Sequence, residues 1–264
     1  MDTNPSVLLT SDEYGVATLT LNRPHRRNAF DLEMIDCWHR SLTAALNDSA
    51  VRVIILTGAG QAFCAGGDLE EVFKFRQQSS LERKNFLWEN VHKIAFALER
   101  ADKPIIAAVN GTATGAGCDM ALMCDMRIAA KSAVFSESYI RLGLIAGDAG
   151  TYFLPRLIGS ARALELFWTG RDVQADEAER IGLVNRTVED AELIAITTEI
   201  ARKIASQSPQ AVRFFKRAVY QGQMSSLAMH LDMVSSHMAV LEDTPEHHAA
   251  LDALAARIRR TKPN

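Results

Sequence analysis

Long apolar runs and a leader segment are both missing from this sequence. No stretch of the 264 residues approaches the roughly 18 apolar residues that a membrane-spanning helix needs. The N-terminal region lacks the charged start and apolar stretch of a signal peptide. We therefore expect no membrane association and no targeting segment.

Charge of one sign is not in excess either. The chain carries 29 Lys and Arg against 32 Asp and Glu, and no block of like charge is long enough to form an interaction tail. Sequence-independent binding of nucleic acid depends on a basic surface. Nucleic acid is therefore excluded as an expected partner.

The sequence has few cysteines, and their spacing does not indicate pairing. The four cysteines have no spacing typical of a disulfide framework or a zinc site: Cys37, Cys64, Cys118 and Cys124. We interpret them as reduced thiols in a cytoplasmic protein and expect no metal site.

The first half of the chain does contain the pattern of short strands joined by helices and Gly-rich turns. Val7–Thr10 and Val16–Leu21 flank a turn and predict a β-hairpin, and a helix is predicted to follow its N-cap residue Asp31. Further strands are predicted at Val51–Leu56, Ile105–Val109, Met126–Ala129 and Val134–Phe135.

The second half reads as almost entirely helical after Gly143. The helices are predicted at Ala161–Trp168, Ala175–Arg180, Ala191–Ser206, Ala211–Tyr220, Ser225–Leu241 and Pro245–Arg260. This order predicts an α/β fold with a core at 1–195 and a helical region at 196–264. The apolar stripes of the tail must be buried on the core or on a neighbouring subunit. Three histidines there are interpreted as solvated or interface residues: His237, His247 and His248.

Two Gly-rich segments, Thr57–Asp68 and Asn110–Asp119, follow predicted strands. Neither ends in the Gly-Lys-Ser/Thr of a phosphate loop, and Met120 stands where a dinucleotide fingerprint needs its last glycine. A nucleotide cofactor is therefore not expected. Two such segments are either ordinary turns, or they each present a backbone N–H group to the same oxygen atom. In the second case they would form an oxyanion hole.

Six ordered motifs make the chain resemble the crotonase, or enoyl-CoA hydratase/isomerase, superfamily. They are Leu21–Pro24 with Asn28-Ala29, Ala62–Leu69, Lys103–Gly111 with Gly115–Cys118, Leu154–Gly159, Leu166-x-x-Thr169-Gly170 and Ala175–Val184. The resemblance implies a crotonase-like ββα spiral core. It also implies a helical C-terminal trimerisation region and a homotrimer or homohexamer.

The resemblance also implies an acyl-CoA substrate and no cofactor other than the coenzyme A that the substrate carries. Its thioester oxygen would accept hydrogen bonds from the N–H groups of Ala65 and Ala116. Charge developing on that oxygen as an enolate would thereby be stabilised. The substrate-binding residues it implies are Arg26, Arg27, Ala29, Gly66, Gly67, Asp68 and Leu69. For Arg26 and Arg27, an equal alternative is that they are ordinary solvated surface charges with no role in substrate binding. Asp68 has an alternative role in tying down loop N–H groups.

The acid–base positions depart from the hydratases of this family, which use two glutamates. Asp119 takes the place of the first and Tyr139 that of the second, and a tyrosine of ordinary pKa is a poor base at neutral pH. We interpret nearby Glu137 as structural or peripheral. Asp148 lies one position after the place, here Gly147, where isomerising and dehalogenating relatives hold a catalytic aspartate. It either enters the pocket or caps a helix beginning near Thr151.

The predicted activity is most simply hydration of a 2-enoyl-CoA, with Asp119 as the leading proton-transfer residue and Tyr139 and Asp148 as the other catalytic candidates. The alternatives are an enoyl- or dienoyl-CoA isomerase that uses Asp119, together with Asp148 if that residue enters the pocket, or an idle acyl-CoA binder. Entry of Asp148 into the pocket would favour the isomerases.

Overall fold

The computed structural model describes residues 5–261, and the chain divides into two compact units, Met1–Ile204 and Ala205–Asn264. Helix α9 (Leu193–Ala205) ends at this division, and Thr197 and Ala201 on its inner face are fully buried. The boundary expected between 195 and 196 falls inside this helix. The assignment of two domains stays a prediction.

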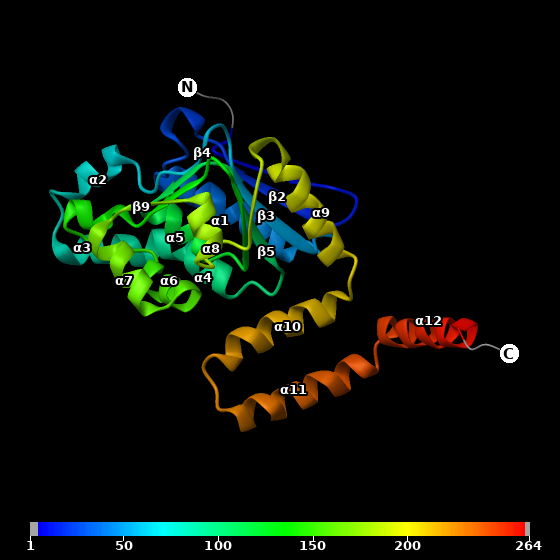
Figure 1. Cartoon of the computed structure of the whole chain (residues 1–264). Helices are drawn as coiled ribbons and strands as arrows, with labels where there is room; N and C mark the ends of the chain where they lie inside the picture. The colour runs from blue at the N-terminus through cyan, green and yellow to red at the C-terminus, as the bar shows by residue number, and fades with distance from the viewer. Residues whose placement is uncertain (1–4, 262–264) are drawn as a thin grey trace. The chain divides into compact units, whose positions relative to one another are not determined.

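Two sheets organise the first unit within the described residues (Figure 1). The larger has the order β1-β2-β3-β5-β7-β10 and the smaller β4-β6-β8-β9. Both are mixed, because β1 with β2 and β8 with β9 are antiparallel while the other neighbours are parallel. The strands are β1 (Val7–Ser11), β2 (Val16–Leu21), β3 (Val53–Gly58), β4 (Ala62–Cys64), β5 (Ile105–Val109), β6 (Thr112–Thr114), β7 (Met126–Ala130), β8 (Val134–Ser136), β9 (Asp172–Gln174) and β10 (Arg186–Val188). The predicted α/β class is confirmed.

Helices cover the sheets and fill the intervals between strands. In the first unit they are α1 (Leu32–Asn47), α2 (Leu69–Phe75), α3 (Ser80–Phe86), α4 (His92–Glu99), α5 (Ala116–Leu122), α6 (Gly150–Ile158), α7 (Ser160–Thr169), α8 (Ala175–Arg180) and α9. Asp31 caps α1 by accepting a hydrogen bond from Met34 N, as its position predicts. The buried face of α1 packs on β1, β2 and α4, and Trp38 at its centre is fully enclosed.

Four strands and three helices are not predicted by the sequence pattern. β4, β6, β9 and β10 are three residues long, too short for a period of two to show. β9 and β10 also interrupt the region that was expected to be almost wholly helical, which corrects that expectation. Helices α2, α3 and α4 fall between the predicted strands, where no helix had been assigned.

The smaller sheet places the two Gly-rich segments side by side. Strands β4 and β6 are parallel neighbours in which Ala62 pairs with Thr112 and Cys64 with Ala113. The segments that follow them, 65–68 and 115–119, therefore leave the sheet at one edge. This edge carries the candidate site.

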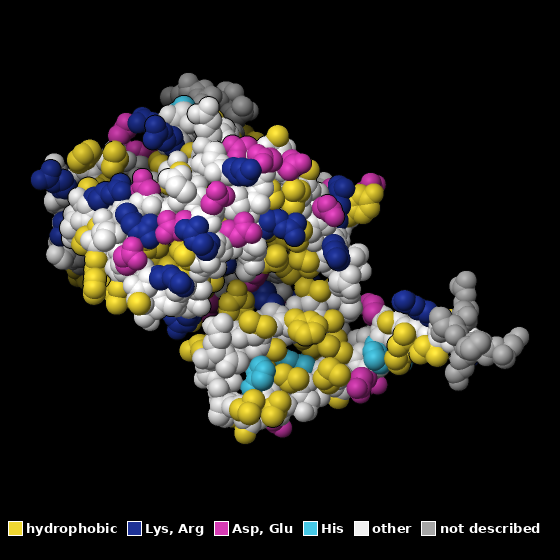
Figure 2. All heavy atoms as spheres, in the orientation of Figure 1, with side chains coloured by type: hydrophobic (Ala, Val, Ile, Leu, Met, Phe, Trp, Pro, Cys, Tyr) yellow, Lys and Arg dark blue, Asp and Glu magenta, His cyan; other side chains and the backbone are white. Residues whose placement is uncertain are grey.

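The second unit consists of α10 (Pro209–Gly222), α11 (Leu227–Glu242) and α12 (Pro245–Thr261). Hydrophobic side chains gather over α10 and α11 (Figure 2), among them Phe215, Val219, Leu227 and Met238, each more than half exposed. His237 stacks on Phe214 with ring centroids 4.3 Å apart. A trimer or hexamer would cover such a surface and stays a prediction.

No helix among the described residues is both long and apolar enough to cross a membrane.

Candidate active site

The two Gly-rich segments are in direct contact because glycines let their backbones approach. Gly66 has a φ of 86°, and a Cβ there would lie 3.3 Å from the N atom of Ala116. A Cβ at Gly117 would lie 2.0 Å from the carbonyl oxygen of Cys64. Any larger residue at 117 would push the segments apart.

The N–H of Ala65 is already committed elsewhere, which corrects the expectation that it faces a substrate oxygen. It donates to the carbonyl oxygen of Arg27 over 3.0 Å. Ala65 is also absent from the cavity wall described below. Its backbone therefore fixes the loop to segment 27–30 and does not offer a donor to a ligand.

Gly67 and Ala116 both line the cavity, one from each Gly-rich segment. On either side of Gly67, the Gly66 carbonyl accepts from Phe30 N and Asp68 N donates to Phe30 O. Within residues 5–261 the Gly67 N–H has no hydrogen-bond partner of its own. Ala116 is the first residue of α5, where an N–H has no partner inside the helix. Both residues can therefore present a backbone donor to the cavity.

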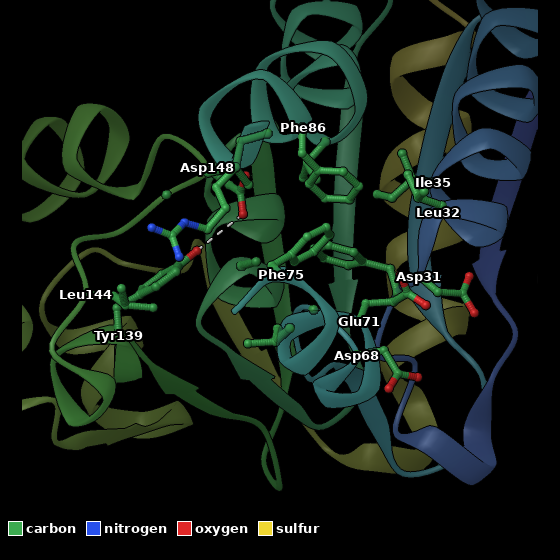
Figure 3. A pocket seen from close by; sticks show the side chains of 18 of the residues that line it. Asp31, Leu32, Ile35, Asp68, Glu71, Phe75, Phe86, Tyr139, Leu144 and Asp148 are labelled. Carbon is green, nitrogen blue, oxygen red and sulfur yellow. Dashed lines mark hydrogen bonds between the residues drawn. The ribbon is translucent and has the colours of Figure 1, made fainter. Parts of the chain in front are cut away.

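Three polar side chains meet beside this pair. The Tyr139 hydroxyl donates to Asp119 Oδ2 over 2.7 Å and lies 3.4 Å from Asp148 Oδ2 (Figure 3). The N–H of Asp148 donates to the same Asp119 oxygen over 3.1 Å. The structure thus brings together the three residues singled out as catalytic candidates.

Asp148 does not cap a helix, so that alternative is wrong. Helix α6 begins at Gly150 and its N-cap is Ala149, with no side-chain cap. The Asp148 residue is only 4% exposed, and it lines the cavity. Of the two arrangements considered for Asp148, the structure has the one in which it enters the pocket.

Asp119 lies behind the cavity wall rather than in it. It is fully buried, and a Cβ added at Gly150 would meet its Oδ1 at 2.1 Å. It is absent from the residues that line the cavity, whereas Tyr139 and Asp148 are present. A substrate in the cavity therefore meets Tyr139 and Asp148, with Asp119 supporting both from the protein side.

Burial shifts the ionisation of this cluster toward neutral acids. Burial, with a smaller contribution from the Asp148 charge, raises the pKa of Asp119 to about 7. Burial also raises the pKa of Asp148, against the opposing effects of His92 and the Tyr139 hydrogen bond. A carboxyl group with a raised pKa is a better base at neutral pH than an ordinary one.

Glu137 is a third buried carboxyl in the same cluster. It is 3% exposed, and neither of its oxygens has a hydrogen bond of normal geometry among the described residues. Burial, followed by the nearby Asp119 charge, raises its pKa to about 10, so Glu137 is neutral at pH 7. It does not line the cavity that Tyr139 and Asp148 line.

The cavity has a volume of about 680 Å³ and mostly apolar walls. Phe75 and Phe86 lie against each other with ring centroids 4.1 Å apart, across the cavity from Tyr139 and Leu144 in Figure 3. The other apolar residues of the wall are Phe30, Leu32, Ile35, Val72, Leu87, Val91 and Ile145. Such a surface suits a hydrophobic ligand with a polar group at the Tyr139 end.

Most of the remaining expected substrate contacts lie outside the cavity wall. Arg26 is exposed and pairs with Glu70 over 2.7 Å, and Leu69 is exposed at the start of α2. Arg27 and Ala29 serve the local fold through their carbonyl oxygens, which accept from Ala65 N and Arg23 Nη1.

Asp68 lines the cavity but has structural partners. It caps α2 through Glu70 N and pairs with Arg23 over 3.1 Å. Sequence reasoning missed Arg76 and Arg83, two exposed cations in the cavity wall. It also missed His92, whose Nε2 lies 2.8 Å from the Gly147 carbonyl oxygen.

No group of three or more potential metal ligands occurs among residues 5–261.

Comparisons with known proteins agree with this geometry. The family model described as enoyl-CoA hydratase/isomerase matches residues 11–256. The chain is 38% identical over 257 residues to the short-chain-enoyl-CoA hydratase of Clostridium acetobutylicum, covering 97% of this chain and 95% of that protein. It is 33% identical over 250 residues to the 1,2-epoxyphenylacetyl-CoA isomerase of Escherichia coli, covering 95% of each. Its structure is similar to that of an enoyl-CoA hydratase from Bacillus anthracis, with a TM-score of 0.88, 35% identity and 96% of each chain covered.

Proposed function

The chain belongs to the enoyl-CoA hydratase/isomerase family, and from that premise we propose that it moves the double bond of an enoyl-CoA rather than adding water to it. The observation that carries this choice is the entry of Asp148 into the cavity beside Tyr139, with Asp119 withdrawn behind them. The proposed reaction needs no cofactor beyond the coenzyme A of the substrate.

The N–H groups of Gly67 and Ala116 hold the thioester oxygen in this proposal. Removing a proton next to the thioester carbonyl places negative charge on that oxygen. Two backbone donors fixed in advance stabilise this charge without rearranging. Ala116 adds the positive end of α5, since the N-terminus of a helix favours an anion.

Asp148 is the proposed base. In a β,γ-unsaturated thioester it takes the proton from the α carbon, and the C–H electron pair moves into the conjugated enolate. The protonated carboxyl then returns that proton to the γ carbon, which leaves the double bond between the α and β carbons. No atom is gained or lost, and Asp148 ends as it began. The Tyr139 hydroxyl lies 3.4 Å from Asp148 Oδ2 and can turn its single hydrogen from Asp119 toward this oxygen.

Hydration is disfavoured by the same contacts. Syn hydration requires two acid–base groups that hold one water between them. Here the Tyr139 hydroxyl and Asp119 are joined directly over 2.7 Å, and Asp119 does not reach the cavity. Of the carboxyl groups in this cluster, Asp148 is the one that faces the cavity, which suffices for a proton shift.

The rest of the cavity suits an acyl-CoA. The apolar wall formed by Phe75, Phe86 and their neighbours would enclose the acyl chain. Arg76 and Arg83 are placed to attract the anionic end of coenzyme A. Arg26 and Arg27 lie outside the cavity wall, so they contribute to attracting coenzyme A only through their exposed charges.

The test follows a β,γ-unsaturated acyl-CoA by the rise of the conjugated enoyl-thioester absorbance. We expect turnover by the unchanged protein and a loss of about 10²- to 10⁴-fold in Asp148→Asn, the usual effect of removing a general base. Asp232→Asn, at an exposed position on α11, is the matched control and should retain full activity. Formation of a β-hydroxyacyl-CoA as the main product would establish hydration instead, and binding without turnover would establish an idle binder.

A further inference from the structure

His92 occupies a special position at the edge of the cavity. It is the first residue of α4 and follows a single turn of π-helix, Leu87–Val91, whose end residues Leu87 and Val91 line the cavity. Such turns are rare and occur frequently at functional sites. The His92 ring packs against Trp88 and Phe96 in T-shaped contacts with centroids 6.1 and 6.4 Å away, and those two rings also contact each other. Its orientation is thus fixed by packing.

The His92 ring contacts the segment that carries Asp148. Nε2 lies 2.8 Å from the carbonyl oxygen of Gly147, and because a carbonyl only accepts, this nitrogen carries a hydrogen. The same Nε2 is 3.6 Å from Asp148 Oδ1. That oxygen is buried and has no hydrogen-bond partner among the described residues.

The peptide bond between Gly147 and Asp148 is therefore held at both ends. Its carbonyl accepts from His92, and its N–H donates to Asp119 Oδ2 over 3.1 Å. Leu144 and Ile145, earlier in the same loop, are 55% and 76% exposed. Ala149, just after it, adopts a left-handed φ of 85°.

We propose that His92 is a positioning residue for Asp148: it clamps the Gly147–Asp148 peptide against Asp119 and turns a ring N–H toward the otherwise unpartnered Oδ1. This role rests on the proposed function of Asp148 as the base. His92 does not line the cavity itself, so it acts through Asp148 and not on the substrate.

The charges around Asp148 give His92 a measurable effect. The other titratable groups buried around Asp148 are acidic in type: Asp119 on α5, Glu137 and Tyr139 after β8, and Cys64 on β4. The cations in the same cavity wall, Arg76 and Arg83, are exposed to solvent. Burial raises the pKa of Asp148, and His92 opposes that rise. Without the imidazole, Asp148 holds its proton to a higher pH. Since the base must be ionised to act, the acid limb of the rate profile moves to higher pH.

The experiment compares His92→Phe, which keeps a ring but has no N–H, with His92→Gln, which restores a donor near the Nε2 position. For the Phe variant we expect kcat to fall about ten- to hundredfold, the scale of one hydrogen bond to a charged group, with KM little changed. The acid limb of kcat/KM should move to higher pH. His92→Gln should recover part of kcat, and His39→Phe on α1 is the control that should change neither quantity.

A structural role alone would lower stability in both His92 variants without moving the acid limb. Wild-type kcat and an unmoved acid limb in His92→Phe, or equal loss in the Phe and Gln variants, would overturn the proposal. If His92→Phe fails to fold, His92→Asn is tested in its place, because the shorter amide side chain does not reach Gly147. This variant must show the same shift of the acid limb to higher pH. The proposed function fails separately, through absence of double-bond migration in the unchanged protein or full activity of Asp148→Asn.

Discussion

Replacing Asp119 by Asn should make the stability of the protein depend less on pH. Asp119 is fully buried and its pKa is about 7, against 3.8 for an ordinary aspartate. Between those values the folded protein holds a proton that the unfolded chain has released. The contribution of Asp119 to the free energy of unfolding therefore falls as pH rises from about 4 to about 7, and this contribution levels off above.

The difference between 3.8 and about 7 corresponds to a free energy on the order of 4 kcal/mol. Asn retains an acceptor oxygen for the Tyr139 hydroxyl and the Asp148 N–H, but it carries no charge at any pH. The variant should match the wild type near pH 4 and exceed it by on the order of 4 kcal/mol at pH 8.

Urea unfolding of both proteins at pH 4, 6 and 8 measures this difference. Asp176→Asn, an exposed aspartate on α8, is the control in which the difference from wild type should not grow with pH. A constant difference between Asp119→Asn and wild type across this range would refute the assignment of a buried, protonated carboxyl at this site. In activity assays Asp119→Asn should also lose less than Asp148→Asn, because Asp119 does not reach the cavity.

Three further outcomes follow from the same geometry. Gly67→Pro removes the proposed backbone donor and should lower kcat about 10²- to 10³-fold. Gly67→Ala keeps the donor, its Cβ meets only Val72 at 3.7 Å, and it should retain most activity in the same steady-state assay. Because the acyl wall is apolar, kcat/KM should rise roughly fourfold for each methylene added beyond a four-carbon acyl group until the wall is filled; a flat series would contradict that placement. Glu137 is neutral at pH 7, so Glu137→Gln should leave kcat at pH 7 unchanged. As pH rises above about 4.5, its urea midpoint should increase relative to wild type; a fall in kcat with no gain in stability would count against this.

The sequence predicted the strands, helices and Gly-rich segments around the site better than the contacts between the residues of the site. β5 and α8 begin and end at the predicted residues, because a β-branched run and a helical period are local signals. The two Gly-rich segments were also identified from their composition. The choice between Ala65 and Gly67 was not accessible, because it depends on a hydrogen bond to Arg27, 38 positions earlier in the chain.

Asp119 and Asp148 illustrate the same limit. Their spacing in the sequence does not show which carboxyl group faces the cavity, since Gly150 and Tyr139 decide this by packing. His92 carried no motif and becomes visible only through its distance to Gly147. An orphaned buried oxygen such as Asp148 Oδ1 is likewise a property of the folded chain alone.

Double-bond migration through Asp148 is tested most directly by locating deuterium in the product. A β,γ-unsaturated acyl-CoA is converted in deuterated water by the unchanged protein, and the product is analysed by mass and proton NMR. We predict a conjugated enoyl-CoA with deuterium bound to carbon at the α or γ position, in an amount set by exchange at the base, and no added oxygen. The Asp148→Asn protein should form product and exchange deuterium about 10²- to 10⁴-fold more slowly. A β-hydroxyacyl-CoA that carries oxygen from the solvent, formed equally well by the Asp148→Asn protein, would contradict the account.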